Sequence, residues 1–168
     1  MSLEEEVPAF DFGIGGYRPR WVVGAAAIGA YGDRLRALAG RRLTRTWLVW
    51  DVEGDEWFAD CPVLLDFEGE QVEVDHARLD DLSITWNTVD PAAPVRWPGF
   101  TLCRRPDAHP APNGLRGREL RGVDLLERKG CVDVRFRFDG GDLTVLNALD
   151  ENELRFDPAP ADRRRDSG

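Results

Sequence analysis

Two stretches of the chain repeat one pattern of apolar and turn-forming residues. The first reads FEGEQVEVDHARLDDLSI (67–84) and the second reads FDGGDLTVLNALDENELRF (138–156). Most matched residues lie 71 positions apart, and one extra residue in the second stretch aligns the last pair. The clearest pairs are Phe67 with Phe138, Val74 with Val145, and Ile84 with Phe156. This similarity predicts an internal duplication, which constrains the fold more than any other feature of the sequence.

An upstream echo supports the duplication. Residues 38–43 (LAGRRL) resemble residues 115–120 (LRGREL), which lie 77 positions later. The changed spacing means that the second copy is shorter by six residues between its two blocks. We therefore predict two repeats, 38–89 and 115–157, joined by a Pro-rich crossover at 90–114.

The second copy carries the clearest strand signal. In CVDVRFRFD (131–139), apolar residues alternate strictly with charged ones, as in an antiparallel strand with one buried face. Asp139-Gly140 then predicts a hairpin turn. Because the chain holds several such short strands, we expect a mainly β domain, α+β at most, with one or two short helices. The repeats predict an antiparallel barrel or sandwich with pseudo-twofold halves.

The remaining boundaries follow from local composition. Residues 21–32 (WVVGAAAIGAYG) fit either a strand or a buried helix, and the sequence leaves this open. Asp33 to Ala39 reads as a brief helix, with Asp33 as N-cap and Gly40 ending it. We expect a single domain at 21–157, an irregular segment at 1–20 and a disordered tail at 158–168.

Cysteine content and hydropathy bear on location. Three widely spaced cysteines without a CxxC pattern argue against a disulfide framework and favour a reducing compartment. The apolar run at 21–32 is too short to cross a bilayer. We therefore expect a cytoplasmic protein that does not bind membranes.

Charge is concentrated in one part of the chain. Residues 51–90 hold thirteen Asp or Glu and one basic residue, Arg78, whereas the whole chain has a net charge of −9. This balance disfavours nucleic-acid binding, which needs clustered Lys and Arg. An acidic segment can instead attract a basic protein.

Several residues of the first half are candidates for ligand or partner binding. Tryptophans beside acids can stack on a ligand or receive an anchor from a partner. Asp75 and His76 end a predicted strand, and His76 aligns with Asn147, so bonding to the turn backbone is its simpler role. The binding candidates are Trp47, Trp50, Trp57, Asp75, His76 and Trp86.

Motifs for catalysis are lacking. The chain has no GxSxG, HExxH or P-loop sequence and no metal-ligand spacing, so we assign no catalytic residue, no metal site and no cofactor. The leading hypothesis is a cytosolic non-catalytic binding protein that engages a basic protein through its acidic, Trp-containing first repeat. One alternative is a small-ligand pocket between the repeats, near Trp47, Trp86 and His76. A carboxylate- or metal-dependent enzyme is the least supported reading, and the oligomeric state stays open.

Overall fold

The computed structural model describes residues 13–159, and this part of the chain is mainly β, with two antiparallel sheets and two short helices. The helices are α1 (Ala26–Arg36) and α2 (Pro110–Asn113). The strands are β1 (Trp21–Val23), β2 (Leu43–Asp51), β3 (Glu56–Trp57), β4 (Val63–Phe67), β5 (Glu70–Ala77), β6 (Asp81–Trp86), β7 (Leu102–Pro106), β8 (Leu120–Arg128), β9 (Cys131–Phe138), β10 (Gly141–Asn147) and β11 (Asn152–Pro158). The predictions for residues 1–12 and 160–168 lie outside the described residues.

The first sheet has the order β1-β6-β5-β4-β2-β3, and β7 pairs with β2. Its central hairpin joins β4 to β5 through Glu68 and Gly69, whose φ angles are +53° and +91°. Positive φ at both central residues matches the twist of the flanking strands, and glycine adopts it without steric cost.

The second sheet has the order β11-β10-β9-β8. Along β9, Val134, Phe136 and Phe138 are buried, whereas Arg135 and Arg137 are partly or fully exposed. The predicted strand is therefore confirmed with one face on the core, and its other face meets water except at Asp133, which is buried.

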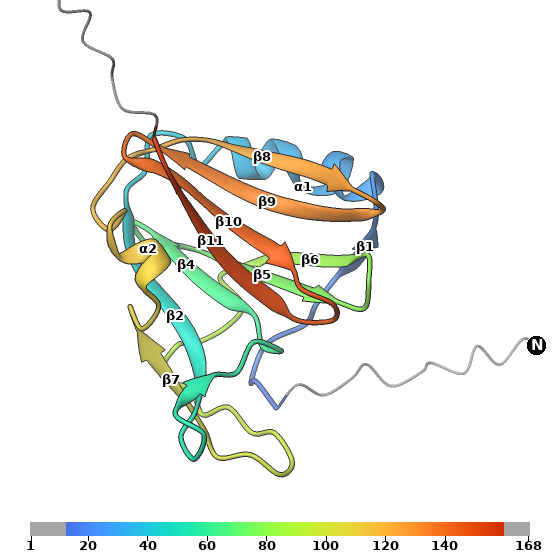
Figure 1. Ribbon diagram of the computed structural model, residues 1–168, viewed down its shortest axis with the longest axis vertical. Coiled ribbons are helices and arrows are strands. Elements are labelled where there is room, and N and C mark those ends of the chain that lie inside the picture. The colour runs from blue at the N-terminus through green and yellow to red at the C-terminus, as the bar shows by residue number, and fades with distance from the viewer. Residues whose placement is uncertain (1–12, 160–168) are drawn as a thin grey trace, which may run out of the picture.

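One core lies between the two sheets, which are not closed into a barrel. Phe67 of the first sheet stacks on Phe136 and Phe138 of the second, with ring centroids 5.7 and 6.4 Å apart. Figure 1 shows the orange and red strands β8–β11 lying over the green strands of the first sheet, with α1 beside β8. Helix α1 adds Tyr31 and Leu35 to this core.

A second, smaller core covers the other face of the first sheet. Ile14 and Tyr17 from the N-terminal segment and Val95 from the crossover pack on Val49 and Leu64. Strands β4 and β5 are consequently buried on both faces. This cover explains why Glu73 and Asp75 are buried although they alternate with valines along β5.

The two halves repeat one strand register. Leu43 of β2 pairs with Phe67 and Leu120 of β8 pairs with Phe138, and an irregularity follows each leucine. The pairing of β6 with β5 and of β11 with β10 corrects the end of the sequence alignment. Val74 pairs with Ile84 and Val145 with Leu154, so Ile84 corresponds to Leu154 and not to Phe156. The connection from Val145 to Leu154 is one residue shorter than the connection from Val74 to Ile84.

The helical predictions need one correction. Residues 21–32 form both a strand and the start of a helix, and α1 begins at Ala26 with Ala25 as its N-cap. The N-cap prediction at Asp33 is therefore wrong, because the alanine-rich run before it propagates the helix well. No helix within residues 13–159 is long and apolar enough to cross a membrane.

Candidate functional site

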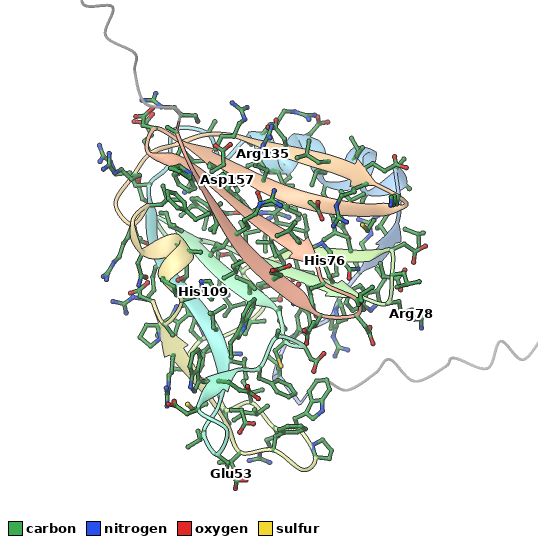
Figure 2. The ribbon with its side chains drawn as sticks, viewed as in Figure 1. Glu53, His76, Arg78, His109, Arg135 and Asp157 are labelled. Carbon is green, nitrogen blue, oxygen red and sulfur yellow. The ribbon has the colours of Figure 1, made fainter. Side chains whose placement is uncertain are left out.

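A cleft of about 590 Å³ opens where the β5–β6 turn meets the β10–β11 turn. Asp75 and His76 form part of its floor, and Arg78 lies on the β5–β6 turn at its rim. Figure 2 shows His76 and Arg78 on the same side of the molecule, with Glu53 at the far tip of the β2–β3 hairpin. The other lining residues used below are Trp21, Asp60, Asp81, Trp97 and Asp150.

The two turns at the rim hold each other through reciprocal hydrogen bonds. The Asp150 backbone N–H donates to the Arg78 carbonyl at 3.0 Å, and the Arg78 N–H donates to Asp150 Oδ1. Asn147 Nδ2 also donates to the Arg78 carbonyl at 3.0 Å. Because both turns are tied in this way, the first and second sheets are fixed to each other at the cleft.

Asn152 is the hub of the polar network beneath the cleft. Its Nδ2 donates to Asp75 Oδ1 at 2.9 Å and to the carbonyls of Ala59 and Cys61 at 3.0 and 3.1 Å. Its Oδ1 accepts from the His76 backbone N–H at 2.9 Å. Asn152 begins β11, so one side chain of the second sheet satisfies several buried groups of the first.

The His76 ring links the two sheets. Its Nδ1 lies 3.0 Å from Asn152 Oδ1, and its Nε2 lies 2.9 Å from the Val132 carbonyl on β9. Burial lowers the pKa of His76, while these two oxygen acceptors favour the protonated ring and oppose that shift. The ring therefore acts mainly as a structural connector, although it also lines the cleft.

Asp75 is fully buried, and both of its oxygens have protein partners. Asn152 donates to Oδ1, and the Tyr17 hydroxyl donates to Oδ2 at 3.1 Å. Burial raises the pKa of Asp75 to about 8, although these two hydrogen bonds act in the opposite direction. Burial, followed by the charge of Asp75, also raises the pKa of Tyr17, so the hydroxyl remains a donor.

The rim of the cleft carries an excess of carboxylates. Burial, followed by the charge of Asp150, raises the pKa of Asp60. Burial also raises the pKa of Asp81, and Arg78 opposes this shift from 3.7 Å. Within the described part of the chain, no ion pair involves Asp60 or Asp150. The rim therefore has three carboxylates against one guanidinium, and Trp21 and Trp97 also line the cleft.

The structure brings two of the six sequence candidates together in the cleft, Asp75 and His76. The four candidate tryptophans do not line it. Trp50 and Trp57 pair across β2 and β3, and Trp57 contacts His109 edge-on at 5.5 Å. Arginine side chains lie over the rings of Trp47 and Trp86. Their guanidinium carbons are 5.5 Å from the ring centroid of Trp47 and 4.2 Å from that of Trp86.

Several residues of the cleft were not identified from the sequence. They come from loops and from the first positions of β1, β6 and β11, where no periodic pattern marks them. The one usable signal was the repeated acidic turn, since the residues after Asn147 resemble those after His76. The missed residues are Tyr17, Trp21, Asp60, Asp81, Trp97, Asp150 and Asn152.

Within residues 13–159, no group of three or more His, Cys, Asp or Glu side chains is arranged to hold a metal ion. Comparison with protein-family models, with curated proteins and with solved structures finds no match to this chain.

Proposed function

We propose that this protein is a non-catalytic binding protein whose cleft receives a cationic side chain of a basic partner protein. The observation that carries the proposal is the uncompensated negative charge of Asp60 and Asp150 beside the indoles of Trp21 and Trp97. Carboxylates attract a cation, and an indole face adds a cation–π contact. The acidic segment of the first half supports the same class of partner.

We also propose that the two halves arose by duplication and form a pseudo-twofold sandwich. The shared register of β2 with β4 and of β8 with β9 supports this, as does the matching irregularity after Leu43 and Leu120. The cleft lies where corresponding turns of the two halves meet, so both halves contribute to a single site. Cytoplasmic location remains part of the proposal, supported by the free cysteines at Cys61, Cys103 and Cys131.

A small cationic ligand is the second candidate. The cleft volume of about 590 Å³ lies in the usual range for small-molecule sites. An enzyme has less support, because both oxygens of Asp75 and both ring nitrogens of His76 already bind protein groups. A general base needs a free position toward its substrate.

The experiment is a titration of ¹⁵N-labelled protein with the peptide acetyl-Gly-Gly-Arg-Gly-Gly-amide, followed by NMR. We expect the indole N–H signals of Trp21 and Trp97 to shift, and binding to weaken as salt increases. Asp60→Asn/Asp150→Asn should weaken binding about tenfold, which is about 1.4 kcal/mol.

The matched control is Glu53→Gln/Glu127→Gln, which removes the same charge from two exposed residues away from the cleft. It should leave the affinity within about twofold of the wild type, a difference of about 0.4 kcal/mol. Equal losses in both double variants would refute the cleft as the site, because they would show attraction by net charge alone. Binding of acetyl-Gly₅-amide with the same affinity would remove the requirement for a cation.

A further inference from the structure

A second groove of about 490 Å³ lies next to the cleft. Trp57 forms one side of it, and Glu56, Glu151 and Glu153 supply carboxylates. It therefore repeats the composition of the cleft, an indole with acidic side chains, and it contains one of the tryptophans that the sequence marks as a binding candidate.

The cleft and the groove share one wall. Ala59 lines the groove, whereas its neighbour Asp60 lines the cleft. Likewise, Glu151 lines the groove, whereas its neighbour Asp150 lines the cleft. The wall is firmly held, since the backbone N–H of Asn152 donates to the Ala59 carbonyl at 3.0 Å. We call this shared wall, residues 59–60 and 150–151, the ridge, because its adjacent residues line different cavities.

The groove keeps its negative charge. In the described part of the chain, no ion pair involves Glu56 or Glu151, and both are exposed. His109, which contacts Trp57, does not offset the charge at neutral pH, because burial lowers its pKa. One continuous acidic surface therefore crosses the ridge from the cleft to the groove.

We infer that the partner binds as an extended basic segment across the ridge, with one cationic side chain in the cleft and a second in the groove. This inference rests on the proposed function and specifies the form of the partner. In an extended chain, residues i and i+2 project to the same side, roughly 7 Å apart, so a short peptide has the reach to span a narrow ridge. Linking two contacts in one chain raises affinity above that of either contact alone.

The test compares the one-arginine peptide with two-arginine peptides whose arginines are separated by one, two, three or four glycines. At least one spacing should bind about tenfold more tightly than the one-arginine peptide, because the second contact becomes intramolecular once the first has formed. Glu56→Gln/Glu151→Gln should abolish that gain and leave binding of the one-arginine peptide unchanged. The control Glu53→Gln/Glu127→Gln should preserve both affinities.

The outcomes separate the two proposals. If every two-arginine peptide binds only about twofold more tightly, as expected for two equivalent ways to fill one site, the extended segment is refuted and the cleft stands. A tenfold gain that persists in Glu56→Gln/Glu151→Gln also refutes it. If no peptide binds at the cleft, both proposals fail.

Discussion

Arg42 and Glu119 form an antiparallel backbone bridge, and the hydrogen bonds around it repeat when each residue of the first segment is exchanged with the residue 77 positions later. Both residues lie at equivalent positions of the matched segments 38–43 and 115–120, so the bridge pairs a position of one segment with the same position of the other. The Gly40 N–H donates to the Leu120 carbonyl at 2.8 Å, and its counterpart is the bond from the Gly117 N–H to the Leu43 carbonyl at 2.7 Å. In the same way, the Leu120 N–H donates to the Arg41 carbonyl at 2.8 Å, and the Leu43 N–H donates to the Arg118 carbonyl at 3.1 Å. These reciprocal bonds are what the proposed pseudo-twofold arrangement requires at this position.

The twofold relation predicts equal effects of equivalent glycine substitutions. Gly40 and Gly117 have φ angles of +93° and +81°, and an added Cβ would meet no atom within 4 Å at either. We therefore expect backbone strain alone to lower the free energy of unfolding, by about 1 kcal/mol in Gly40→Ala and by the same amount in Gly117→Ala. Urea denaturation measures both.

Gly29→Ala is the control for this pair. Gly29 lies inside α1 with open space around its Cα, so alanine there should stabilise the protein by roughly 0.5–1 kcal/mol. A loss at Gly40 more than twice that at Gly117 would argue against equivalent roles for the two glycines.

The second prediction concerns the aromatic contact between the repeats. Phe67 and Phe138 occupy equivalent positions and stack across the core at 6.4 Å. Replacing each with leucine, singly and together, should reveal a coupling energy of about 0.5–1.5 kcal/mol in the free energy of unfolding. Phe67 and Phe58 belong to different cores, so the same cycle on that pair should be additive within about 0.5 kcal/mol. Coupling of equal size in both pairs would contradict a specific contact.

The fold was predictable where one face of a strand meets water. The alternation in β9 identified the strand and its buried face, and Asp139-Gly140 identified the turn between β9 and β10. The same argument fails for Glu73 and Asp75, which alternate with valines on β5 but are fully buried. Glu73 instead accepts hydrogen bonds from Thr88 and Val89. The cover over this face comes from irregular segments that have no period to detect.

The site was less predictable than the fold. Asp75 and His76 were identified because they end a strand, but their main partner, Asn152, lies 76 residues beyond His76. Which loops meet at the cleft depends on how the two sheets pack. The aligned turn compositions showed that the turns are alike, not that they touch.

Asn152 gives the third prediction. Asn152→Ala would leave the His76 N–H, Asp75 Oδ1 and the Cys61 carbonyl without their present partner in a buried site. Since each lost buried hydrogen bond costs about 1–3 kcal/mol, the total loss in unfolding free energy should be at least about 3 kcal/mol. Asn147→Ala, at the half-exposed position equivalent to His76, should cost about 1 kcal/mol. Equal losses of unfolding free energy in the two variants would show that Asn152 is not the central residue of the buried polar network.

The last prediction is the pH dependence that Asp75 imposes on stability. Its pKa rises from the ordinary 3.8 to about 8 in the folded protein, so between these values the folded state keeps a proton that the unfolded chain releases. Stability should therefore fall as pH rises through this window, by up to about 1.4 kcal/mol per pH unit. The lowered pKa of His76 has the opposite effect, a loss of stability as pH falls through 6.5, so the two partly cancel at acidic pH.

Urea denaturation between pH 7 and pH 8 isolates the Asp75 effect, because the His76 effect is small there. Asp75→Asn should flatten the decline in this interval, since asparagine does not titrate. Asp157→Asn, an exposed change on β11, should keep the wild-type slope. A wild-type stability that is level or rising from pH 7 to pH 8 would show that Asp75 is ionised in the folded protein, and would contradict the prediction.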